Sequence, residues 1–174
     1  LGSPKNNLYV DYIYLDTDER RRFAQVSHEY LIEQVQTQTV TEKNSNLNFN
    51  HPVKELIWHN AGFTDISGSN AKFGLSLNGH DRFSERPSDY FTQQQVYDYH
   101  TGCGGLLVNA GTAGQPMKQN DSIGVYSFAL KPEEHQPSGT CNFSRIDSAR
   151  FVIEISSDSL NLTIYAINYN ILRI

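Results

Sequence analysis

The chain has 174 residues, of which 38% are hydrophobic, which is enough for one domain with a substantial core. Fourteen basic and nineteen acidic residues give a net charge of −5, which argues against a surface that neutralises nucleic-acid phosphates. No apolar run reaches the length of a membrane-spanning helix. The two cysteines are too few for a disulfide-stapled scaffold or a four-cysteine zinc cluster, so we expect both thiols to be reduced.

The N-terminal residues 1–4 resemble the remnant that a protease leaves when a purification tag is removed. The start of the chain also lacks the charged, apolar and small-residue order of a signal peptide. No composition break is long enough to be a linker. We therefore expect a fragment of a longer protein, with residues 5–174 forming a single domain.

The first third of the chain predicts strands and one helix. Residues 8–15 (LYVDYIYL) are rich in β-formers and predict a strand covered on much of both faces. Asp16 followed by Glu19 is a capping-box pattern, which predicts that a helix starts here; the pattern does not define where it stops, and we place the change to a strand near Ser27. Strands are predicted at 35–41 and 53–60, separated by an Asn-rich loop over 42–52.

The remaining two thirds predict mainly strands and turns. Strands are predicted at 72–79, ending in the turn pair Asn78-Gly79, and at 123–130, 149–156 and 160–174. Between them, residues 86–102 could hold at most one helical turn, and residues 102–116 are predicted to be a glycine-rich loop. The last strand changes its apolar face midway, which indicates a bulge, a change of sheet or a second buried face. Seven or eight strands with one early helix and no βαβ alternation indicate an antiparallel sandwich or barrel.

Residues 136–147 (QPSGTCNFSRID) offer the most reactive-looking side chains, including the thiol of Cys141. Their Pro-Ser-Gly start is a turn signal, and we interpret the stretch as a structural loop. His100 and Cys103 have H-x-x-C spacing, with His135 and Cys141 at a distance, but nothing in the sequence brings three or four ligands together. We predict no catalytic, cofactor-binding or metal-binding residues.

Two further groups have simple structural explanations. Asp16 and Asp18 are better explained as a helix start than as a catalytic pair, and Arg20 to Arg22 are expected to form ion pairs. Three Asn-x-Ser/Thr triplets make Asn120, Asn142 and Asn161 possible glycan acceptors, but their number is close to the chance expectation.

Five collinear segments together resemble one protein family. They are residues 9–36, 78–91, 100–103, 136–147 and 165–174, of which DTDERRRFAQ and PSGTCNFSRID are the most specific. They resemble the C-terminal part of the major capsid protein of large nucleocytoplasmic DNA viruses, of the iridovirus and phycodnavirus type that giant amoebal viruses share. The resemblance implies an all-β, eight-stranded antiparallel jelly-roll sandwich with a short helix between early strands, which would be the second roll of a double jelly roll.

The resemblance also implies a structural role without enzymatic activity or cofactor. Three double rolls would form a homotrimeric, pseudo-hexagonal capsomer that tiles an icosahedral shell in the virion, assembled in the host cytoplasm. Its partners would be itself, neighbouring capsomers and minor capsid proteins, with no direct nucleic-acid contact and no membrane insertion. The first roll is absent here, so the apolar second face of 165–171 is expected to face that roll or a trimer contact.

Two other functions remain open at this point. A jelly-roll lectin would bind sugar through solvent-facing loops, for which 42–52 and 102–120 are candidates. A metal-dependent jelly-roll enzyme would need closely spaced His-x-His ligands, and no His-x-His occurs in the chain.

Overall fold

The computed structural model describes residues 8–60, 66, 71–102, 106–107, 119–120, 123–155 and 161–174. The backbone divides into two compact units, which are Leu1–Tyr30 with Ile171–Ile174 (unit 1) and Leu31–Asn170 (unit 2). The helical elements are α1 (Thr17–Gln25), the π-helix η2 (Tyr90–Gln94), α2 (Gln95–Tyr99) and the 3-10 helix η3 (Phe143–Arg145). The strands are β1 (Glu29–Val40), β2 (Asn44–Asn46), β3 (Pro52–Asn60), β4 (Lys72–Leu77), β5 (His80–Pro87), β6 (Leu106–Leu107), β7 (Gln119–Asn120), β8 (Ile123–Ser127), β9 (Cys141–Asn142), β10 (Ala149–Glu154) and β11 (Leu162–Arg173).

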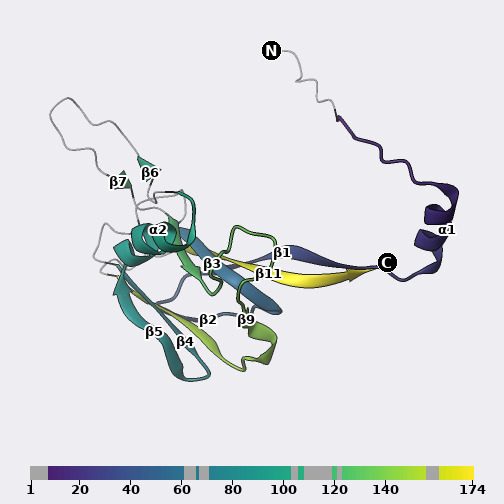
Figure 1. Cartoon of the computed structure of the whole chain (residues 1–174). Helices are drawn as coiled ribbons and strands as arrows, with labels where there is room; N and C mark the ends of the chain where they lie inside the picture. Colours follow the sequence, from purple (N-terminus) through teal and green to yellow (C-terminus); the bar gives the residue numbers. More distant parts are fainter. Residues whose placement is uncertain are drawn as a thin grey trace, which may run out of the picture. The chain divides into compact units, whose positions relative to one another are not determined.

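Two sheets form a sandwich (Figure 1). Sheet A has the order β1-β11-β3-β8, with β9 also paired to β3, and sheet B has the order β2-β10-β4-β5. Strands distant in sequence are neighbours in both sheets and pair antiparallel, as in a jelly roll. The jelly-roll prediction is therefore confirmed. Among the described residues the sandwich has nine strands where eight were predicted, because the two-residue β9 adds to β3; β6 and β7 form a separate ladder.

Local sequence signals place several elements. Asp16 is the N-cap of α1, where its Oδ1 accepts a hydrogen bond from the N–H of Thr17 (2.7 Å). The helix ends at Gln25, two residues before the change that we placed near Ser27. Asn78 and Gly79 both have positive φ (52° and 79°) and join β4 to β5, as a two-residue hairpin turn requires. Both the helix and the hairpin turn are therefore confirmed.

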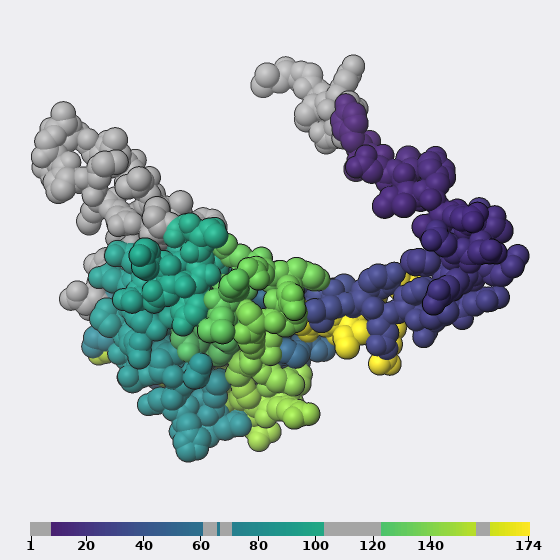
Figure 2. Space-filling view, viewed as in Figure 1, coloured from purple at the N-terminus to yellow at the C-terminus, as the bar shows by residue number. Residues whose placement is uncertain are grey.

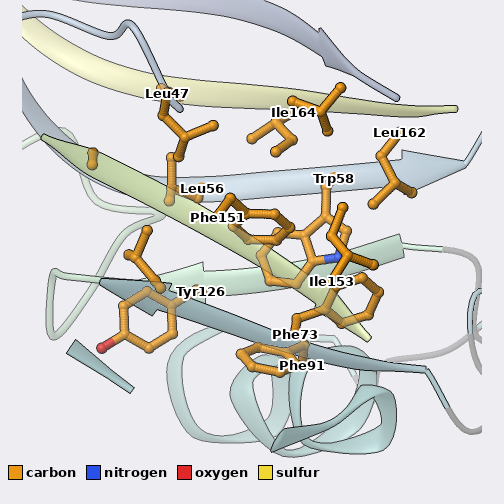
Figure 3. Packing of buried hydrophobic residues seen from close by; sticks show 14 of the residues in the cluster. Leu47, Leu56, Trp58, Phe73, Phe91, Tyr126, Phe151, Ile153, Leu162 and Ile164 are labelled. Atoms are coloured by element: carbon orange, nitrogen blue, oxygen red, sulfur yellow. The ribbon is translucent and has the colours of Figure 1, made fainter. Parts of the chain in front are cut away.

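The core centres on Trp58 of β3, which is fully buried between the sheets (Figure 3). Its rings lie 5.3 Å from Phe73, 5.2 Å from Phe91 and 5.2 Å from Phe151 in edge-to-face geometry, measured between centroids. Burying one such side chain contributes about 1.5–3 kcal/mol, and each aromatic pair adds about 0.5–1.5 kcal/mol. This aromatic cluster joins β3 of sheet A to β4 and β10 of sheet B.

The last strand, β11, keeps its alternation, because Leu162, Ile164, Ala166 and Asn168 are all buried; its midway change of apolar face arises because Tyr169 is buried on the other face, beside Lys54. The irregularity is a β-bulge in the neighbouring strand β3. Ile167 of β11 lies opposite Glu55, but the next residue, Asn168, lies opposite Val53, so Lys54 is an extra residue in β3. Val53 and Leu56 are three residues apart and would face opposite sides of a regular strand, yet both are fully buried in the core cluster. The bulge therefore leaves two consecutive charged residues, Lys54 and Glu55, on the outer face of sheet A.

Four predictions differ from the structure. The strand predicted at 8–15 is wrong: these residues are exposed, and no described strand pairs with them. The helix α1 consequently precedes β1 rather than lying between strands. The region 86–102 contains η2 and α2, which is more helix than predicted, and the loop 42–52 contains β2. Most of the predicted loop 102–116 lies outside the described residues.

Candidate functional site

The stretch 136–147 is a structural connection, as interpreted from its turn signals. A side chain at Gly139 (φ 149°) would place its Cβ 2.9 Å from the carbonyl oxygen of Phe128, so this turn needs glycine. Phe143 is buried in the core cluster. Ser144 Oγ accepts a hydrogen bond from the N–H of His51 (2.8 Å), which ties the stretch to the segment before β3.

Cys141 is not an activated nucleophile in this environment. The thiol is half-buried in β9, and burial raises its pKa, an effect that the charge of Arg82 only partly opposes. A raised pKa leaves little thiolate at neutral pH, and the thiolate is the reactive form.

The candidate metal ligands do not converge. His100 contacts Glu55 and Glu133, whereas His135 lies near Glu33 and Cys141 lies in β9. Cys103 is outside the described residues. Within the part of the chain that the structure describes, no group of three or more His, Cys, Asp or Glu side chains could hold a metal ion.

The acidic and basic residues at α1 form a helix cap and an ion pair within the helix. Asp16 caps it, and Asp18 lies 3.9 Å from Arg21, in place of the i,i+4 pairs expected for Arg20 and Arg22. Both partners are exposed, so the pair contributes about 0–1 kcal/mol. No side chain of α1 is buried.

The three possible glycan acceptors lie in different settings. Asn161 is exposed immediately before β11. Asn142 is half-buried, and its Oδ1 accepts a hydrogen bond from the N–H of Ser144 (3.1 Å). Asn120 belongs to β7, and its side chain is outside the described residues. Of the two asparagines whose side chains are described, Asn161 is the more accessible.

The sugar-binding role considered for residues 42–52 has no support in their geometry. Leu47 and Phe49 point into the core cluster. The backbone N–H groups of Asn48 and Asn50 donate to the side chains of Gln38 and Gln36 of β1 (2.9 and 3.0 Å). These contacts hold residues 47–50 against the core and against β1.

Two buried charges on the outer face of sheet A were not anticipated from the sequence. Lys54 is only 3% exposed, and its Nζ lies 2.7 Å from Glu33 Oε1 and 5.6 Å from the ring centroid of Tyr169. Glu55 Oε2 lies 3.2 Å from His100 Nε2. Buried charges require such partners. In the sequence, the neighbouring charged residues Lys54 and Glu55 inside an otherwise apolar strand could have indicated the bulge.

Unit 1 presents a large set of exposed apolar side chains, which we call the apolar surface. They are Leu8, Tyr9, Val10, Tyr12, Ile13, Tyr14, Leu15, Phe23, Val26, Tyr30, Ile171, Leu172 and Ile174. Ile13 and Tyr14 are 87% and 90% exposed. Large exposed apolar surfaces are typical of sites that contact another protein. None of the described helices is long and apolar enough to cross a membrane.

Comparison with known proteins gives a consistent family. The family model described as large eukaryotic DNA virus major capsid protein matches residues 19–67 and 65–174. The major capsid protein of Pyramimonas orientalis virus is 51% identical over 184 residues, covering 96% of this chain and 46% of that protein. That of Paramecium bursaria Chlorella virus 1 is 34% identical over 244 residues, covering 99% and 52%. The chain thus spans about half the length of the curated relatives it matches.

Solved structures agree with the sequence comparison. The quasi-atomic model of the PBCV-1 virus capsid superposes with a TM-score of 0.72 at 32% identity, covering 94% of this chain and 53% of that one. The Faustovirus major capsid protein, at 12% identity and a TM-score of 0.64, shares the fold, with 92% of this chain and 36% of that one covered. The sandwich topology and the matches over nearly the whole chain establish that this chain belongs to the large eukaryotic DNA virus major capsid protein family.

Proposed function

We propose that the chain is the C-terminal jelly-roll part of a structural subunit of an icosahedral viral capsid. The observation that carries the proposal is the agreement of nearly the whole chain with the PBCV-1 capsid protein in both sequence and fold. The same agreement favours the capsid role over the lectin alternative. A shell subunit acts through its contacts, so it needs no catalytic group.

In this proposal, residues 5–174 are the second roll of a double jelly roll, and residues 1–4 are a tag remnant. Three complete subunits form a homotrimeric, pseudo-hexagonal capsomer. The apolar surface of unit 1 supports this, because obligate interfaces are large and apolar. Burying it gains about 25 cal/mol for each Å² of apolar area removed from water.

The protein works in the virion, after assembly in the host cytoplasm. Its partners are neighbouring capsomers and minor capsid proteins. The net charge of −5 supports a shell that does not bind nucleic acid directly.

The experiment measures the oligomeric state of the complete two-roll protein by size-exclusion chromatography with light scattering. We expect a stable trimer, and a monomer at every concentration would contradict the proposal. Ile13→Asp places a charge on the apolar surface and should weaken association or packing of the complete protein. Asp11→Asn, two residues away, is the matched control and should leave the trimer intact.

A further inference from the structure

A short loop on the outer face of sheet A is closed by its own contacts. Residues 131–138, which we call the latch loop, begin at Lys131, whose N–H donates to Ser138 Oγ (2.9 Å) and whose Nζ lies 3.0 Å from Glu134 Oε1. The loop is therefore a small preformed unit. In Figure 2 the green surface of this region lies beside the teal surface of η2 and α2, in agreement with the contacts of Glu133.

Glu133 joins the latch loop to the end of α2. Its Oε1 accepts hydrogen bonds from the N–H of Thr101 (3.0 Å) and the hydroxyl of Thr101 (3.2 Å), and it lies 3.3 Å from His100 Nδ1. The other ring nitrogen of His100, Nε2, lies 3.2 Å from Glu55 Oε2. This contact is an ion-pair distance without hydrogen-bond alignment: both atoms are buried, and neither has a hydrogen-bond partner in the described residues.

The number of N–H groups on the His100 ring decides whether the ring can hold both carboxylates. A neutral histidine has one N–H, so it can donate to only one of two carboxylates, whereas the imidazolium donates to both. With a neutral ring, one of the two contacts would set a nitrogen lone pair against a carboxylate oxygen. The His100 side chain is 16% exposed, so water does little to relieve that opposition.

We propose that His100 is a pH-responsive latch: its doubly protonated ring bridges Glu55 and Glu133 and, together with the two hydrogen bonds from Thr101, holds the latch loop against α2, and loss of one ring proton to water removes the contact between the ring and Glu133 and loosens the loop. The contact between His100 and Glu133 is the one that breaks, because the Glu133 side chain is 42% exposed and can turn to solvent. Glu55 is buried on β3 and cannot leave. The latch is a property of this chain's own fold and does not depend on the proposed capsid role.

The surrounding charges are compatible with this assignment. The pKa of His100 is raised, first by its close contact with the Glu55 carboxylate; burial of the ring opposes the rise, and the charge of Glu55 and the contacts with Glu133 add to it. The pKa of Glu133 is lowered, first by the N–H of Thr101. Other charged groups lie nearby: Glu33 of β1 pairs with Lys54 of β3 and with His135, and Lys131 pairs with Glu134 within the latch loop.

The direction of the pH dependence follows from these shifts. A raised histidine pKa means that the stabilisation is complete below the ordinary value of 6.5 and is lost as the pH rises through the raised pKa. The latch loop also contains His135, which is more exposed than His100 and lies 3.6 Å from Glu33. The experiment must therefore separate the two histidines.

Hydrogen-deuterium exchange of the 174-residue chain between pH 5.5 and 8.5, corrected for intrinsic exchange rates, tests the latch. We expect protection of peptides covering 131–138 to fall about five- to tenfold with rising pH, the size of one ordinary hydrogen bond, because the Glu133 side chain is partly exposed. His100→Gln should abolish this dependence. His135→Gln is the matched control and should retain it.

Glu133→Gln provides a second arm, because it removes the exposed carboxylate and leaves the buried His100–Glu55 contact in place. It should also abolish the pH dependence, even if His100→Gln does not fold. Protection that is independent of pH in the unmodified chain would overturn the latch. So would a dependence that survives Glu133→Gln or disappears in His135→Gln.

Discussion

The substitution Gly124→Ala tests whether the packing around Trp58 is as tight as the structure indicates. Gly124 of β8 lies directly opposite Trp58 of β3. A Cβ added at Gly124 would lie 2.5 Å from Trp58 Nε1 and 2.8 Å from Cζ2, which is well inside van der Waals contact. The indole cannot move away easily, because Phe73, Phe91 and Phe151 surround it.

The magnitude follows from two opposing effects. Overpacking a well-filled core costs about 1–3 kcal/mol. Replacing glycine by alanine where the backbone permits it gains about 0.4–1 kcal/mol by restricting the unfolded chain. We therefore expect Gly124→Ala to lower the free energy of unfolding by about 1–2 kcal/mol.

Gly74→Ala is the matched control in the opposite sheet. Its added Cβ would lie 3.4 Å from Glu85 Cγ and 3.5 Å from Val152 Cβ, which is ordinary contact, so stability should be unchanged or slightly higher. Urea unfolding followed by the fluorescence of the single tryptophan measures both variants. Equal stability of Gly124→Ala and Gly74→Ala would refute the steric argument.

Three further predictions address the hairpin, the core and the thiol. Asn78→Ala should cost about 2 kcal/mol in urea unfolding, since its Oδ1 accepts from the N–H groups of Asp147 and Ser148 and its φ is positive; no loss would show that the turn tolerates any residue. Phe151→Ala should cost about 3–5 kcal/mol by the same assay, with the exposed Tyr97→Ala near zero as its control. Cys141 should react with a maleimide at pH 7 more slowly than a free thiol, because burial raises its pKa; equal rates would contradict this environment.

Short-range signals were sufficient wherever the decisive interactions are local. Asp16 caps α1 because its side chain reaches the N–H of the next residue, and Asn78-Gly79 makes a hairpin because both residues accept positive φ. The alternation of apolar residues in 149–156 predicted β10, whose alternate side chains Phe151 and Ile153 are buried. These features depend on neighbours a few residues away, and the sequence displays those neighbours directly.

The candidate site was much less predictable. His100, Glu55 and Glu133 are separated by 33 or more residues, and they meet only because β3, α2 and the latch loop converge on one face. No spacing rule connects them. By contrast, the collinear segments that carried the family resemblance needed no geometry, and the comparisons confirmed that family.

The sequence by itself determined the family, the sandwich class, the first helix and most strands, because side-chain periodicity, turn chemistry and family motifs are written along the chain. Only the tertiary structure decided that residues 8–15 pair with no strand in the part of the chain that the structure describes, since β-pairing requires a neighbouring strand, which the alternation of side chains cannot supply. It also decided that Tyr169 gives β11 a second buried face and that a bulge adds one residue, Lys54, to β3. That single extra residue places Lys54 and Glu55 side by side on the outer face, where their partners come from distant parts of the chain.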